Sequence, residues 1–223
     1  MALATIHHPP LQAPDNGRRA SSDGSSGWWV CIDTETTGLP DDLGARVIEV
    51  GMVLVEPRGR PIATWSTLVR EQRRNPQRAE AESVHGISPD MLERAPTAEE
   101  AGQAIRRQLW TWGSGRLALG SWNRDFDRPM LERSGLTLRH QPWLPCLQLA
   151  TTPLLHGAGF PHPAEGRRSE RAPLQAACRW AGVPPQGPAH RALSDALATV
   201  ELLRICRDPG ALWARRELAC TAV

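Results

Sequence analysis

Four acids and one histidine stand in three short strings that lie far apart in the chain. In order, these residues are Asp33, Glu35, Asp127, His190 and Asp195. Carboxylate oxygens are hard ligands, which favour magnesium or manganese over zinc. A pair of such ions is a common device for displacement at phosphorus, and a histidine can take a proton from the attacking water. The residue types therefore indicate a metal-dependent nuclease site, provided that the fold brings the three strings together.

The first two acids close a predicted buried strand. The apolar run 28–32 leads directly into Asp33 and Glu35. Because the side-chain period of a strand is two, both carboxylates point to one face. Two like charges about 4 Å apart repel by roughly 4 kcal/mol at an effective dielectric of about 20. A cation is therefore expected beside this pair.

In the last string, 190–195, the histidine and the acid cannot lie on the same face of one helix. Five residues advance by about 500° on a helix, which leaves His190 and Asp195 roughly 140° apart. We therefore expect His190 just before a helix or in its first turn, and Asp195 on the helix itself. A histidine with an ordinary pKa of about 6.5 can accept a proton at physiological pH. This arrangement suits a mobile general base and a fixed metal ligand.

The strings must be positioned by an alternating α/β pattern. Apolar or alternating runs predict strands at 28–32, 46–56, 61–70 and 116–121. Pro57 and Gly59 form the turn between the second and third strands, so the first three make a meander. Thr97 can cap a helix that runs to about residue 112. Further helices are predicted directly after Asn123 and at 172–182, 190–205 and 211–219.

The chain of 223 residues has room for one α/β domain with tails. Residues 1–27 lack periodicity and are predicted to be a disordered leader. The domain is expected at 28–207, followed by a C-terminal helix or tail at 208–223. Within the domain, the segment 156–173 is polar and rich in Gly and Pro, which predicts a mobile insertion loop.

Composition excludes several classes of protein. All 26 basic residues are Arg, so chemistry that needs a lysine, such as a Schiff base, is impossible. The five cysteines are odd in number and show no C-x-x-C spacing, and the N-terminus has no apolar signal core. These features predict a reduced, cytoplasmic protein. No apolar run approaches the roughly 18 residues that cross a bilayer, so no membrane partner is expected.

The three strings also match a known pattern. The orders Asp33-x-Glu35, Asn123-x-x-Phe126-Asp127 and His190-x4-Asp195 resemble the three motifs of the DEDD exonuclease superfamily, His subclass. This superfamily includes the proofreading subunit of bacterial replicative polymerase and ribonuclease T. VHGISPDML at 84–92 resembles the segment between the first two motifs. The sister subclass uses a Tyr in place of His190, and this chain has no Tyr. The resemblance spans residues 28–207 and implies a ribonuclease H-like α/β fold, with a mixed five-stranded sheet flanked by helices.

The resemblance implies a metal-dependent 3′-to-5′ exonuclease that releases nucleoside 5′-monophosphates from DNA or RNA 3′ ends. It assigns two divalent cations, Mg²⁺ or Mn²⁺, to the carboxylates of Asp33, Glu35, Asp127 and Asp195. His190 would act with one ion to generate the attacking hydroxide. The residues implied to bind the terminal nucleotide are Thr36, Thr37, Gly38, Leu39, His85 and Asn123. Leu39 would wedge against the base, and Asn123 would either orient Asp127 or contact the substrate.

Several alternatives stay open at this stage. The same fold could trim RNA in the manner of ribonuclease T rather than act on DNA. The chain could also be a catalytically silent module that binds nucleic acid or a partner protein, or an unrelated α/β protein with scattered acids. A homodimer is possible, and a polymerase partner is uncertain. Only 28 residues follow Asp195, whereas the proofreading relatives carry a longer tail that docks their polymerase, which favours a free-standing enzyme.

Overall fold

A computed structural model describes residues 27–71, 78–113, 116–162, 171–208 and 210 of the chain. The strands are β1 Trp29–Thr36, β2 Val47–Val55, β3 Pro61–Leu68 and β4 Ala118–Gly120. The helices are α1 Arg78–His85, α2 Pro89–Glu93, α3 Ala98–Gly113, α4 Arg124–Arg133, α5 Leu147–Gly157, α6 Leu174–Ala181 and α7 Ala192–Cys206. The predicted leader, apart from Gly27, and the predicted helix at 211–219 lie outside the described residues. Within the described ranges, no helix is both long and apolar enough to cross a bilayer.

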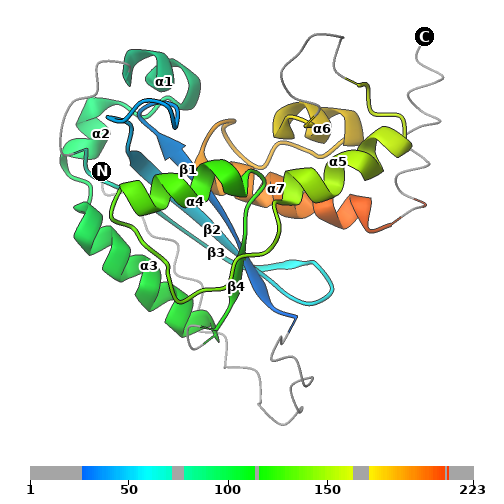
Figure 1. Cartoon of the computed structure of the whole chain (residues 1–223), viewed down its shortest axis with the longest axis horizontal. Helices are drawn as coiled ribbons and strands as arrows, with labels where there is room; N and C mark the ends of the chain where they lie inside the picture. Colours follow the sequence, from blue (N-terminus) through cyan, green and yellow to red (C-terminus); the bar gives the residue numbers. More distant parts are fainter. Residues whose placement is uncertain (1–26, 72–77, 114–115, 163–170, 209, 211–223) are drawn as a thin grey trace.

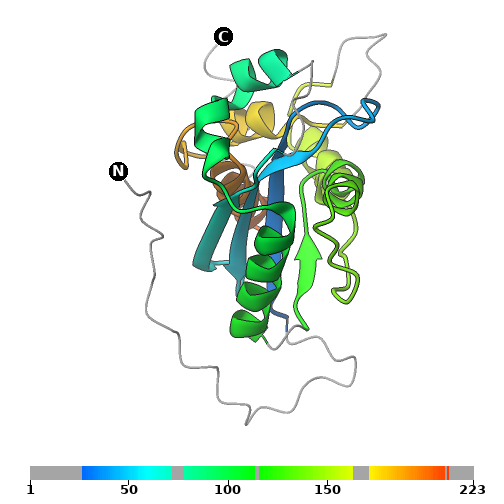
Figure 2. The same cartoon turned by 90° about the vertical axis from the view of Figure 1, so that its left-hand side faces the viewer.

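A mixed sheet with the strand order β3-β2-β1-β4 forms the centre of the fold. The first three strands are the predicted meander, since β1 pairs antiparallel with β2 and β2 pairs antiparallel with β3. β4 returns parallel to β1 on its other side. Helices α3 and α4 cover one face of the sheet, and α7 lies across the other (Figures 1 and 2). β1 is therefore central, and its carboxyl end carries the first acidic string.

The expected sheet of five strands is wrong by one, because the described residues form four. The segment after α4 does reach the β4 edge, but it pairs there only through an isolated parallel bridge between Leu119 and Trp143. The Leu119 N–H donates to the Pro142 carbonyl and the Leu144 N–H donates to the Leu119 carbonyl, both at 2.8 Å. Pro142 has no N–H to donate to Leu117, so the ladder cannot extend towards the start of β4.

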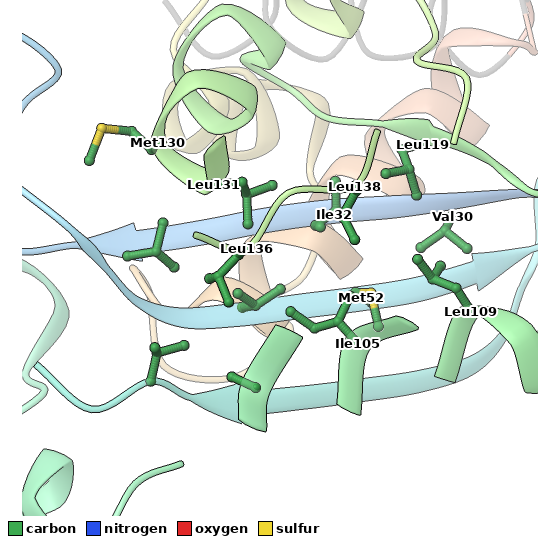
Figure 3. Packing of buried hydrophobic residues seen from close by; sticks show 14 of the residues in the cluster. Val30, Ile32, Met52, Ile105, Leu109, Leu119, Met130, Leu131, Leu136 and Leu138 are labelled. Carbon is green, nitrogen blue, oxygen red and sulfur yellow. The ribbon is translucent and has the colours of Figure 1, made fainter. Parts of the chain in front are cut away.

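The predicted helix at 97–112 is confirmed as α3. Thr97 and Glu100 form a reciprocal cap: the Glu100 N–H donates to the Thr97 hydroxyl at 3.3 Å, and the Thr97 N–H donates to the Glu100 carboxylate at 2.8 Å. Apolar residues of α3 and α4 then pack on Val30 and Ile32 of β1 (Figure 3). This core fixes β1 from the face opposite to its acid pair.

The predicted loop at 156–173 is corrected at both ends. His156 and Gly157 are the last residues of α5, a helix that the sequence did not predict because Pro153 interrupts its pattern. Ala158, Phe160 and Ala172 are buried in a cluster with residues of α6 and α7. Apolar anchors therefore hold the two ends of the segment to the core, and residues 163–170 lie outside the described part of the chain.

Candidate active site

Three acids meet at the carboxyl end of β1. Asp33 and Glu35 alternate with buried Thr34 along the strand, so both project to the α7 face. Asp195 lies in the first turn of α7, the helix that covers this face of the sheet. One carboxylate oxygen from each residue lies within 4.8 Å of the other two. This spacing would let a single cation be bound by all three residues.

Asp127 lies beside this group but is not part of it. It is 2% exposed, and one oxygen accepts a hydrogen bond from the Thr34 hydroxyl at 2.7 Å. The other oxygen accepts a short hydrogen bond from the Ser121 hydroxyl. Thr34 belongs to β1 and Ser121 follows β4, so the parallel pairing of these strands places both donors at one end of the sheet. Since a carboxylate oxygen has two lone pairs, Asp127 can keep both bonds and still bind a cation.

His190 precedes α7, as the helical geometry of its string predicts. Helix α7 begins at Ala192, and His190 has a φ of 55°, in the left-handed region that non-glycine residues rarely adopt. The His190 backbone N–H faces the Asp195 carboxylate and opposes the burial that raises the pKa of this acid. The side chain of the histidine is partly exposed and available to a ligand.

Gln175 and Ser121 are among the residues that hold the acids and were not found by sequence reasoning. The Gln175 side chain on α6 donates to Asp195 Oδ1 at 2.8 Å. Ser121 is the donor to Asp127 described above. A signal existed for both: Gln175 is a polar residue within an apolar helical pattern, and Ser121 directly follows a predicted strand just before the second string. Neither signal is specific enough to assign a role without the fold.

Burial and mutual repulsion raise the pKa values of the acids when no cation is bound. Burial, followed by repulsion from Asp127 and Glu35, raises the pKa of Asp33 well above its usual value. Burial and the nearby Asp195 raise the pKa of Glu35 to about 8. Burial also raises the pKa of Asp127 to about 6, although the Ser121 and Thr34 hydrogen bonds oppose the shift. A bound cation would favour the ionised forms, so the site is built to take up positive charge.

These shifts predict how pH and metal together affect stability. A carboxyl group whose pKa is raised by folding contributes stability below its unfolded pKa, and that stability is lost as pH rises through the folded value. For Glu35 this window runs from 4.5 to about 8. In chelator, the melting temperature should therefore fall between about pH 5 and about pH 8. Magnesium should restore it, and the magnesium-induced increase should grow with pH over the same range.

Differential scanning fluorimetry with and without magnesium measures this effect, and Glu35→Gln is the matched variant because it cannot titrate at this position. In Glu35→Gln the metal-free melting temperature should vary less with pH. A magnesium-induced increase that is the same at both ends of the range would contradict the prediction.

The predicted nucleotide-binding residues occupy the turn that follows β1. The Thr36 hydroxyl donates to the Gly38 carbonyl at 2.7 Å, and the Thr37 hydroxyl accepts from the Arg46 N–H at 3.0 Å. These bonds fix the turn internally. Leu39 follows with 64% of its surface exposed, so its apolar side chain is open to a ligand.

His85, at the end of α1, lies beside this turn. It is 5% exposed, and its Nδ1 accepts from the Ile87 N–H at 3.0 Å, so the proton of the neutral ring is on Nε2. Nε2 lies towards the Thr36 carbonyl but makes no hydrogen bond of normal geometry with any described residue. Burial lowers the pKa of His85. The structure thus places a neutral histidine donor next to the turn.

Asn123 positions Asp127 through its backbone rather than its side chain. Its carbonyl accepts the Phe126 and Asp127 N–H groups at 2.8 and 3.0 Å, which starts α4. Its buried Oδ1 has no hydrogen-bond partner in the described part of the chain. An unpartnered buried acceptor is costly, so Oδ1 lacks a donor that a small local rearrangement could supply.

The fold and the acid cluster define a nuclease-type hydrolase, and comparisons with known proteins agree. The family model "Exonuclease" matches residues 30–111. The chain is 28% identical over 186 residues to an uncharacterized exonuclease of Escherichia phage 186, covering 82% of this chain and 89% of the relative. It is 32% identical over 176 residues to a DNA polymerase III subunit epsilon-like protein of Rhodobacter capsulatus, covering 78% of this chain and 23% of that one. Together with the three motifs, these matches support a place for the chain in the DEDD exonuclease superfamily.

Solved structures share the fold. Cell-death related nuclease 4 aligns with a TM-score of 0.61 and 17% identity, over 80% of this chain and 62% of that one. Escherichia coli exonuclease I was solved with a dT13 oligonucleotide. It aligns with a TM-score of 0.63 and 16% identity, over 81% of this chain and 41% of that one. The chain therefore spans less than two thirds of either solved protein.

Proposed function

We propose that the chain is a 3′-to-5′ exonuclease of the His subclass that holds two divalent cations and releases nucleoside 5′-monophosphates. The observation that carries this proposal is the group formed by Asp33, Glu35 and Asp195, whose carboxylate oxygens lie within 4.8 Å of one another. Asp127 adds a fourth carboxylate beside Asp33. An all-oxygen set of this kind fits magnesium or manganese.

The side chains have distinct tasks in the proposed reaction. When bound, the cations would lower the pKa of the attacking water and offset the charge on the leaving 3′-oxygen. His190 accepts the proton of that water, because its partly exposed side chain stands next to the acid group. Thr36, Thr37 and Gly38 present the turn to the terminal nucleotide, and the exposed Leu39 packs against its base. The His85 Nε2–H and Asn123 Oδ1 offer one donor and one acceptor to the same nucleotide.

DNA is the first substrate to try, because the similar exonuclease I was solved with a DNA oligonucleotide. RNA remains the alternative, and the distinction depends on contacts to the 2′-hydroxyl group. A catalytically silent binding module is the second alternative. Its main difficulty is that all four acids are present in the chain.

Metal removal tests the proposal directly. Single-stranded DNA, 3′-recessed duplex DNA and single-stranded RNA, each labelled at the 5′ end, are incubated with magnesium, manganese or chelator. We expect a ladder that shortens from the 3′ end with either metal, and intact substrate in chelator. The released product should co-migrate with a nucleoside 5′-monophosphate on ion-exchange chromatography.

Other results of this experiment would contradict particular parts of the proposal. Release of the 5′ label as a mononucleotide would overturn the proposed direction, and cleavage in chelator would overturn the metal mechanism. Intact oligonucleotides that nevertheless bind would assign the chain to the silent module. Shortening of RNA at a much higher rate than DNA would replace the DNA substrate by RNA and leave the mechanism in place.

A further inference from the structure

A fifth acid, Glu49, is buried near the acid group and is bonded to the start of α7. It lies on β2 directly opposite Glu35 in the antiparallel ladder and is 4% exposed. The Arg191 guanidinium binds both of its oxygens, with Nε at 3.0 and 3.2 Å and Nη2 at 2.5 Å. The Ala192 N–H also donates to Glu49, at 3.0 Å. One side chain on β2 thus binds two consecutive residues, the N-cap residue of α7 and its first helical residue.

Glu49 replaces the missing cap of α7. The first N–H groups of a helix have no partner within it and are usually satisfied by the side chain of the N-cap residue. Here the N-cap residue is Arg191, whose side chain makes no capping hydrogen bond. Glu49 supplies that bond from a different element, so the position of the helix end is tied to β2.

A charge at this place is otherwise unfavourable. Glu49 acts repulsively on Asp33, Glu35 and Asp195, which already repel one another. Arg191 compensates Glu49, so four carboxylates remain for two divalent cations, and the charges balance. Because a neutral residue at position 49 would avoid the repulsion, the acid is best explained by the bonds it makes to Arg191 and Ala192.

Gly51 marks how closely α7 approaches the same strand. It lies two residues after Glu49, on the same face of β2, and pairs with Asp33. A Cβ atom on Gly51 would lie 2.3 Å from the Leu193 nitrogen and 2.4 Å from the Ala192 carbonyl carbon. The backbone of the first turn of α7 therefore rests directly on β2, next to the strand that carries the acid pair.

We propose that Glu49 and Arg191 form a positioning clasp that sets the distance from His190 and Asp195 to Asp33 and Glu35. Arg191 is linked to both functional residues at the start of α7. His190 directly precedes it, and the Asp195 N–H donates to its carbonyl at 3.0 Å. The clasp also holds the left-handed backbone at His190, since a strained conformation persists only where its surroundings impose it. Both residues act through the others and touch neither cation nor substrate. This role rests on the proposed hydrolysis.

The clasp is tested with Arg191→Lys, Arg191→Gln and Glu49→Gln. Lysine keeps the positive charge but cannot make the bidentate hydrogen bonds of arginine. The variant therefore separates the effect of geometry from the effect of charge. We expect kcat on a labelled oligonucleotide to fall about 10- to 100-fold in all three, with KM changed less than about threefold. The control is Arg204→Gln, which removes an exposed ion pair with Glu201 on the same helix and should leave kcat unchanged.

The outcomes separate the clasp from a general loss of structure. The melting temperature in chelator identifies any variant that fails to fold, and the remaining folded variants then decide. Full activity of Arg191→Lys, or a loss confined to KM, would overturn the clasp. If the wild-type protein hydrolyses nothing, the proposed function fails, and the clasp is decided by manganese binding alone. Thermal-shift titration should then give a midpoint about tenfold higher in the folded variants than in wild type, and an unchanged midpoint would overturn it.

Discussion

Asp33→Asn should abolish hydrolysis while making the metal-free protein more stable. The substitution keeps the shape of the side chain but removes the cost of burying an acid that must either hold its proton or repel Asp127, Glu35 and Asp195. Loss of one shared ligand removes several kcal/mol of charge stabilisation from the transition state, so kcat should fall at least about a thousandfold. The melting temperature in chelator should rise at neutral pH, and the magnesium-induced increase should shrink. Oligonucleotide cleavage and thermal denaturation measure the two effects on the same sample.

The opposite signs make this a sharp prediction. If Asp33 only contributed to folding, its substitution would lower the melting temperature of the protein. The magnesium-induced increase would then stay unchanged. Glu201→Gln is the matched control, because Glu201 lies on α7 but pairs with Arg204 on the outer surface. It should retain wild-type kcat. Retention of more than about a tenth of the activity in Asp33→Asn would contradict the role of Asp33 as a metal ligand.

His190→Gly should separate activity from stability in a second way. The φ of 55° at His190 is unfavourable for a residue with a side chain and ordinary for glycine. Glycine can adopt this backbone and keep the N–H directed at Asp195, so the melting temperature should be unchanged or slightly higher. General base catalysis contributes typically 10²- to 10⁴-fold, and kcat should fall by a factor in that range.

The metal site provides the internal check on this variant. Asp33, Glu35 and Asp195 are unchanged in His190→Gly, so the magnesium-induced thermal shift should persist. His190→Asn tests the side chain alone, since asparagine tolerates the left-handed region but cannot act as a base. Wild-type kcat in either variant would exclude His190 as the proton acceptor. Loss of the magnesium response would instead show that His190 supports the acid group structurally.

The site concentrates charge on elements whose positions are fixed elsewhere. β1 is covered by α3 and α4 on one face and by α7 on the other, so the acid pair cannot relax away from Asp195. Hydrogen bonds from Ser121 and Thr34 hold Asp127, and Gln175 holds Asp195. Repulsion among carboxylates is thus preserved rather than relieved, which favours the binding of cations.

The sequence by itself determined the parts of the site that depend on local geometry. The strand period placed Asp33 and Glu35 on one face, and the helical period placed His190 before α7 and Asp195 within it. It also determined the meander and the capped helix α3, because turn residues and caps act over a few positions. The prediction of a fifth strand failed for an equally local reason, since Pro142 cannot donate the next ladder hydrogen bond.

Only the tertiary structure decided how the strings meet. Glu49 and Arg191 are 142 residues apart, and nothing in the pattern of either segment predicts their pairing. The close approach of α7 at Gly51 and the donors to Asp127 likewise depend on strand register and on which helix covers which face. Periodicity reports the face on which a side chain lies, whereas the partner on that face is set by long-range packing. The chemistry of the site and its local geometry were therefore readable from residue types and spacing, and its long-range geometry was not.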